Sequence, residues 1–268
     1  MRKTLLLAVA IALGVAGTAY AVVTVTNHYT YHTKVTPTKS GTRAHPRPVA
    51  LHVDVTATAT PAGYRPNIVK TIDLTGQGLQ QHTNFFPACG TARLTDPAEG
   101  PATCPKGSLA GTGFFIVWIS KPGDQTPSGK VTVCRVEMSI YNGGNHTLSI
   151  YVYSNGKAGE CPLPQPAAFH ANLTHTGRGL VLTFTIPQAL RHPTVGTVTF
   201  DAAAIQASAD LPAKQTTVKH KKGNKTIKTK VGLFESISCP HNHQRFTSTK
   251  LTLENGHSNT LTRLVRCS

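Results

Sequence analysis

The chain has 268 residues, which is long enough to bury a sizeable core as one large domain or two small ones. It carries 27 Lys and Arg against 11 Asp and Glu, a formal net charge of +16 that favours polyanionic partners. The acidic residues show no pair at a telling spacing, which disfavours a glycosidase, and the absence of Cys-x-x-Cys leaves zinc ribbons and redox motifs unsupported.

The N-terminus predicts export. Arg2 and Lys3 precede an apolar segment, and Ala19-Tyr20-Ala21 fits the small-x-small rule of a secretory cleavage site, so we expect residues 1–21 to be a signal peptide. The alternative is an uncleaved N-terminal anchor, because roughly 20 apolar residues can span a bilayer. This anchor is the one membrane contact we expect. In both cases the basic pair favours the cytoplasmic side, which places the body outside the cell or on its surface.

Residues 22–47 contain four basic residues, no acidic residue, and Thr, Pro and His at short intervals. This composition predicts a basic, mostly extended linker, used either as a spacer or as a binding arm. From residue 48 the pattern changes. Apolar and polar residues alternate over 49–60, which is the period of a half-buried strand.

The rest of the chain reads as extended segments. The apolar run 114–119 predicts a strand that buries Phe114, Ile116 and Trp118, and 201–207 favours a bulged strand over a short helix. Turn signals predict four hairpins: 130–141 with 146–154, 168–175 with 180–186, 216–222 with 225–230, and 245–253 with 258–267.

No stretch of a dozen residues shows apolar spacing at the helical period. About a dozen strands with turns at short intervals predict an all-β fold, an antiparallel β-sandwich of jelly-roll or immunoglobulin-like type over 48–268. The Pro-rich break at 162–166 is the candidate boundary between two sub-domains, and we favour one domain because the break is short.

Six cysteines in an exported chain indicate three disulfides that staple the fold. Fifteen pairings are possible, and we expect sequence neighbours to pair because each pair flanks a local strand or loop unit. The expected bridges are Cys89 with Cys104, Cys134 with Cys161, and Cys239 with Cys267. Each is worth on the order of 3 kcal/mol if it is unstrained.

Motifs for chemistry are weak, and we expect no catalytic residue and no cofactor. Lys106-Gly107-Ser108 has the wrong order for a phosphate loop, since Lys precedes Gly and a strand follows. His241 and His243 are candidate metal ligands at i and i+2, but a site needs three or four ligands and no third is visible. The favoured interpretation is a pair of surface loop histidines.

The Gly223-Asn224 hairpin is the sharpest surface feature. A two-residue turn pairs Lys222 with Lys225 and places four lysines on one face: Lys219, Lys221, Lys228 and Lys230. Like charges across strands cost stability, so this face serves solubility and edge protection or binds a polyanion. Aromatic residues are not interleaved there, which disfavours nucleic acid as the partner.

Three motifs carry a resemblance. They are Phe86-Pro87-x-Cys89, then Cys104-Pro105-Lys106-Gly107-Ser108-x-x-Gly111-x-Gly113, and a closing Ser238-Cys239 before a last hairpin that ends in Cys267. The chain resembles a group of uncharacterised secreted proteins of high-GC Gram-positive bacteria over most of its exported part. The resemblance implies an extracellular β-rich protein without an established activity, so no functional residue is carried over.

The sequence thus favours an exported, non-enzymatic protein that binds acidic cell-wall polymers or glycans through the lysine hairpin, by screened electrostatic attraction. The alternative is a secreted carbohydrate-active enzyme, a polysaccharide lyase or glycoside hydrolase. That enzyme would show a concave sheet face lined by Tyr, His, Arg and carboxylate side chains together. The sequence leaves the oligomeric state open.

Overall fold

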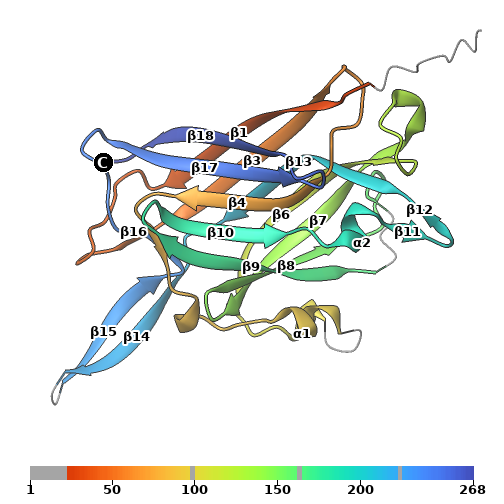
Figure 1. Ribbon diagram of the computed structural model, residues 1–268. Helices are drawn as coiled ribbons and strands as arrows, with labels where there is room; N and C mark the ends of the chain where they lie inside the picture. Colours follow the sequence, from red (N-terminus) through yellow and green to blue (C-terminus); the bar gives the residue numbers. More distant parts are fainter. Residues whose placement is uncertain (1–22, 97–99, 162–164, 223–224) are drawn as a thin grey trace, which may run out of the picture.

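A computed structural model describes residues 23–96, 100–161, 165–222 and 225–268 (Figure 1). The expected signal peptide or anchor, residues 1–21, lies outside these ranges. The fold is all-β, antiparallel and stapled by disulfides, as predicted. Its main part is one sheet of eleven strands. In sheet order these are β1 (Thr26–Thr36), β3 (Ala50–Thr60), β13 (Asp201–Leu211), β6 (Leu109–Ser120), β7 (Lys130–Gly144), β8 (Thr147–Tyr153), β9 (Ala167–Thr176), β10 (Gly179–Thr185), β4 (Val69–Gly76), β17 (Gln244–Leu253) and β18 (Ser258–Arg266).

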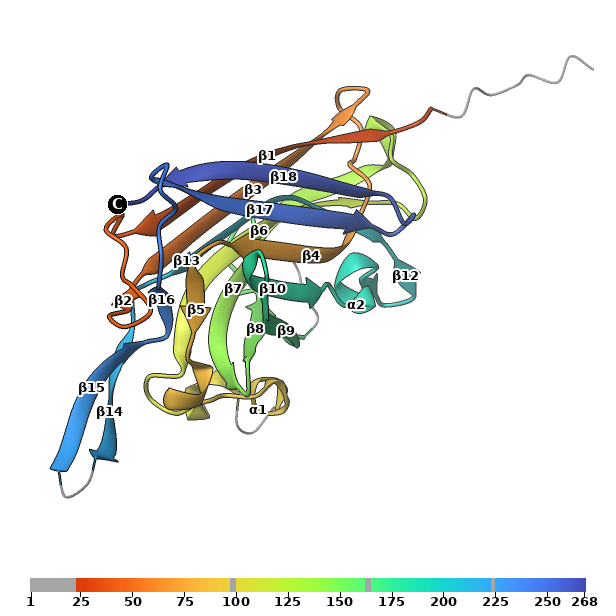
Figure 2. The same ribbon diagram turned by 60° about the vertical axis from the view of Figure 1, so that its left-hand side comes forward.

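This sheet curls until its two edge strands, β1 and β18, lie side by side (Figure 2). Arg263 Nε donates a hydrogen bond to the Tyr31 carbonyl across the seam, at 2.9 Å. The two layers expected of a sandwich are therefore opposite walls of one continuous sheet. Strand twist and bulges supply the curvature, including the predicted bulge of β13, between Ala204 and Gln206.

All four predicted hairpins are confirmed, as the pairs β7–β8, β9–β10, β14–β15 and β17–β18. Here β14 is Gln215–Lys222 and β15 is Lys225–Gly232. Residues 162–164 of the candidate domain boundary lie outside the described ranges. The strands that flank it, β8 and β9, are neighbours in the same sheet, so the sheet runs through this point as one unit.

The linker expected at 22–47 is wrong for Thr26–Thr36, which forms the edge strand β1 and pairs with β3 over its whole length. Its buried positions are Asn27, Tyr31 and Val35. Because Asn27 and the partly buried Thr33 also lie on this inner side, the alternation of apolar and polar residues is interrupted and the sequence reads as a linker.

Small elements close the two ends of the curled sheet. At one end a three-stranded sheet is made of β2 (Arg47–Pro48), β16 (Phe234–Ser236) and β5 (Leu79–Gln81), and it adds Leu79 and Phe234 to the core. At the opposite end (Figure 1) lies the single-turn helix α2 (Gln188–Arg191), followed by the short strands β11 (Thr194–Val195) and β12 (Val198–Thr199). The remaining short elements are η1 (Thr83–Phe85), α1 (Thr91–Thr95), η2 (Pro101–Thr103) and η3 (Pro127–Gly129).

The three disulfides are the predicted ones, Cys89–Cys104, Cys134–Cys161 and Cys239–Cys267. They indicate an oxidising environment. The loop tied by the first bridge lies on the outside of the sheet, where Cys89 and Leu94 pack on Tyr141 and Tyr151. In the described part of the chain, no helix is long and apolar enough to cross a membrane.

The prediction of which β6 residues face the interior was wrong, because the other alternating set of side chains points inside. Phe115, Val117 and Ile119 point inside, whereas Trp118 and Phe114 lie on the outer face. There Lys130 Nζ sits 4.8 Å from the Trp118 ring centroid, and the Arg135 guanidinium carbon sits 3.7 Å from that of Phe114. Both alternating sets of this strand are apolar, so periodicity could not choose between them.

Candidate functional site

The lysine hairpin, β14 and β15, forms a two-stranded sheet of its own that projects from the end of the molecule closed by β16 (Figure 2). The register is the predicted one. Lys219 lies opposite Lys228, and Lys221 and Lys230 fall on the same face. The turn residues 223–224 lie outside the described ranges. Because the hairpin is separate from the eleven-stranded sheet, it does not protect an edge of that sheet.

The four lysines of this face are exposed. No Asp or Glu occurs in the sequence between Asp210 and Glu235. Among the described residues, no carboxylate lies within ion-pair distance of any of the four ammonium groups. The hairpin therefore presents uncompensated positive charge on a projecting ribbon.

The root of the hairpin is held by Glu235, whose side chain is 3% exposed. Its carboxylate accepts hydrogen bonds from the Gly232 N–H at 2.7 Å and from Gln80 Nε2 at 2.8 Å, and His82 Nε2 lies 2.9 Å away. Burial acts to raise the pKa of Glu235, but these hydrogen bonds outweigh it and hold the pKa below the ordinary value. The ionised carboxylate of Glu235 therefore fixes the point at which the hairpin joins the rest of the molecule.

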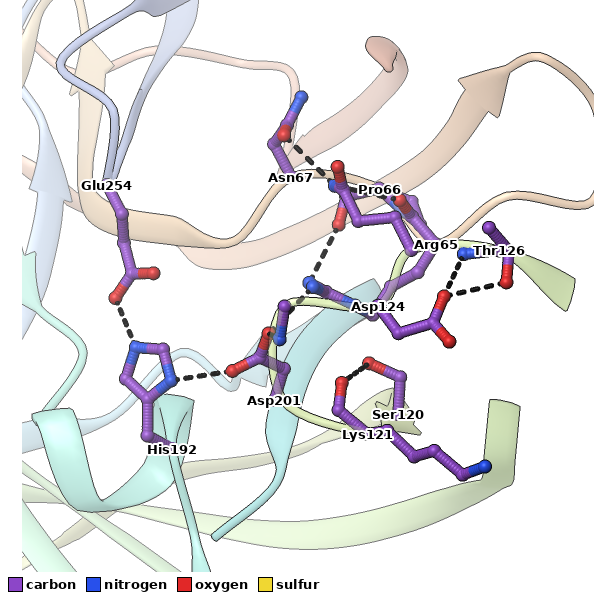
Figure 3. A network of polar contacts seen from close by, with 12 residues as sticks. Arg65, Pro66, Asn67, Ser120, Lys121, Asp124, Thr126, His192, Asp201 and Glu254 are labelled. Carbon is purple, nitrogen blue, oxygen red and sulfur yellow. Dashed lines mark hydrogen bonds and ion pairs between the residues drawn. The ribbon is translucent and has the colours of Figure 1, made fainter. Parts of the chain in front are cut away.

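A second cluster of charge lies at the α2 end (Figure 3). Asp201 Oδ2 lies 3.0 Å from Arg65 Nη2 and accepts the Gly123 N–H at 2.9 Å. Asp201 Oδ1 lies 2.9 Å from His192 Nδ1, and His192 Nε2 lies 2.8 Å from Glu254 Oε1. Glu254 is also ion-paired with Arg191, the last residue of α2. The network joins five parts of the chain: the loops after β3, β6 and β17, the end of α2 and the start of β13.

The α2 network differs from the hairpin in that its charges are paired. Arg65 is 3% exposed, and burial lowers the pKa of its guanidinium while Asp201 and Asp124 oppose that change. Both ring nitrogens of His192 lie within hydrogen-bond distance of carboxylate oxygens, those of Asp201 and Glu254. The geometry is that of a network of ion pairs and hydrogen bonds that holds these segments together.

The interior of the curled sheet is apolar and contains cavities. Three of them, of about 70, 80 and 70 Å³, are lined mainly by aliphatic and Phe side chains, with a few polar residues at the ends. An empty cavity of this size costs roughly 1.5–2 kcal/mol of stability relative to a filled one. This concave face lacks the mixed Tyr, His, Arg and carboxylate lining expected of the carbohydrate-active enzyme, within the described residues.

The metal candidates His241 and His243 are exposed in the loop before β17. In the described ranges, no group of three or more His, Cys, Asp or Glu could hold a metal ion, so the structure brings no third ligand to this pair. The Arg65–Asp201 pair was missed from the sequence because its partners lie 136 positions apart. The one local indication of this pair was an Asp residue, Asp201, at the start of an expected strand.

Comparison of the chain with protein families, curated proteins and solved structures finds no match.

Proposed function

We propose that the protein is exported and binds an anionic polymer of the cell envelope, an acidic wall polymer or glycan, through the lysine hairpin. The observation that carries this proposal is a projecting ribbon with Lys219, Lys221, Lys228 and Lys230 on one face and no described carboxylate to neutralise them. Adjacent ammonium groups raise the local positive potential, which attracts a polyanion and falls off with salt.

Two further features support the proposal. The disulfides fit an oxidising, extracellular compartment, which is where envelope polymers are found. The hairpin is anchored through Glu235 and so presents its charged face in a defined direction. The resemblance to secreted proteins of high-GC Gram-positive bacteria remains a prediction that agrees with this setting.

The test compares two variants that lose the same formal charge. One replaces the four hairpin lysines by Gln. The control replaces four exposed lysines of the body by Gln: Lys34, Lys70, Lys106 and Lys250. Binding to heparin and to cell walls purified from a high-GC Gram-positive bacterium is measured between low and physiological salt.

We expect the hairpin variant to lose at least tenfold in affinity and most of the salt dependence, and the body variant to lose less than threefold. Equal losses in the two variants would show that the net charge binds the polymer and that the hairpin has no special part. Unchanged binding in both would reject electrostatic attachment altogether.

A further inference from the structure

One part of the inner wall of the curled sheet is only partly buried, although it faces away from the outer surface. Inward aliphatic side chains of β3, β4, β6, β10 and β13 retain accessible area. They include Leu51, Val55, Leu74, Val117, Leu182 and Ala204. A close-packed core would bury such side chains fully, so the interior holds space.

The three cavities lie in a row. The first, at the α2 end, shares Phe115 with the central one. The central cavity shares Leu74, Leu148 and Leu182 with the third, which reaches Leu79 and Phe234 at the opposite end. Together they form a narrow apolar path along the length of the sheet, interrupted by the Phe115 ring.

Polar groups occur at the ends of this path. Arg191 lines the first cavity, and the hydroxyl-bearing Tyr31, Thr33 and Thr247 line the third. Burial raises the pKa of the Tyr31 phenol, while hydrogen bonds with the two threonines oppose this.

Helix α2 separates the path from the outside. Leu190 and Pro193 line the first cavity and also line a surface pocket of about 870 Å³, which includes Gln188 and His192. The wall between the first cavity and this surface pocket is therefore one short helix thick.

We propose that the interior binds a single unbranched long acyl chain, which enters past α2 and leaves its polar head group in the surface pocket. A narrow path fits an extended flexible chain better than a wide rigid ring. Its aliphatic walls offer apolar contacts along the chain, and polar side chains of the surface pocket such as Gln188 offer hydrogen bonds to a head group. This ligand is independent of the polyanion proposed above.

The test uses cis-parinaric acid, a fluorescent fatty acid, titrated into the full exported chain. Ala204→Leu fills the first cavity and Ala209→Leu fills the central one, whereas Ala92→Leu adds the same atoms to the exposed helix α1 as a matched control. We expect saturable binding of one equivalent by the unmodified protein and the control, and at least a tenfold loss in each cavity variant.

Phe115→Ala provides a test that does not depend on overfilling the core. Removal of the ring joins the first two cavities, so the preferred chain should lengthen in a series of saturated fatty acids competed against the probe. Native mass spectrometry with palmitic acid and with palmitoyl lysophosphatidylcholine tells whether a free acid or a lipid is taken. Binding of neither ligand, or equal probe affinity in all four variants, would overturn the proposal.

Discussion

The two ends of the curled sheet both concentrate charge, but they use it differently. At the α2 end, Arg65, Arg191 and His192 meet Asp201 and Glu254, and the buried Arg65 has a carboxylate partner. At the other end, the lysine hairpin has no carboxylate partner among the described residues and lies in solvent. Paired, buried charge fixes loops in place, whereas unpaired, exposed charge is available to a partner. The contrast predicts stability effects at one end and binding effects at the other.

The largest effect is expected from Asp201→Ala. This change leaves the Arg65 guanidinium buried without its carboxylate and should lower the free energy of unfolding by about 3–5 kcal/mol. The measurement is urea unfolding at neutral pH. The control is Asp210→Ala on the same strand, where the Asp side chain is 70% exposed beside His52 and the loss should stay below about 1 kcal/mol. Similar losses at both positions would contradict the distinction between the two ends.

Glu235→Gln tests the buried carboxylate at the hairpin root and should cost about 1.5–3 kcal/mol at pH 7, because charge-assisted hydrogen bonds are lost. The folded-state pKa of Glu235 is lowered from the ordinary 4.5, so the carboxylate stabilises the fold above that value. The difference in unfolding free energy between the unmodified protein and the Gln variant should therefore shrink as the pH falls through 4.5 to the lower folded-state pKa. A difference that is constant between pH 7 and pH 3 would argue against this role.

Ala204→Leu should stabilise the α2 end by about 0.5–2 kcal/mol, because the added methylenes fill the first cavity. Thermal unfolding of this variant is compared with that of Ala92→Leu, for which we expect a change within about 0.5 kcal/mol. Destabilisation by Ala204→Leu would mean that the wall collapses around the cavity in solution.

The smallest effect is expected from Lys219→Gln. This change removes one of two directly opposed ammonium groups and should raise the unfolding free energy of the hairpin by about 0.2–1 kcal/mol. Hydrogen exchange of the β14 and β15 amides is the readout, since the hairpin opens locally. Combining it with Lys228→Gln should add little, because the repulsion is already gone. Additive gains would show that the two groups do not interact.

The local parts of this fold were predictable. Turn pairs such as Asn255-Gly256 marked the positions of the hairpins, and each cysteine paired with its sequence neighbour. The lysine face followed from the two-residue turn alone. What could not be predicted depends on distant partners. Strand β1 was missed because polar residues interrupt its inner face, and the apolar run of β6 fits either orientation.

The candidate sites also divide into one formed by neighbouring residues and others formed by distant ones. The hairpin is encoded within eighteen consecutive residues, 215–232, so its charge and face could be inferred. The Arg65–Asp201–His192 network and the apolar cavities exist only when the strands of the curled sheet come together. No spacing in the sequence reports the volume left between side chains of β3, β10 and β13. The proposed acyl-chain site could be found only from the structure.

Trp118 is the only tryptophan of the chain, and its ring lies outside the sheet beneath Lys130. Its strand neighbours Val117 and Ile119 line the first cavity from the other side. The tryptophan emission of the protein therefore comes from a single site, one strand thickness from the proposed ligand. A spectroscopist can record ligand entry as a change in quenching or lifetime of this one fluorophore, without attaching a dye.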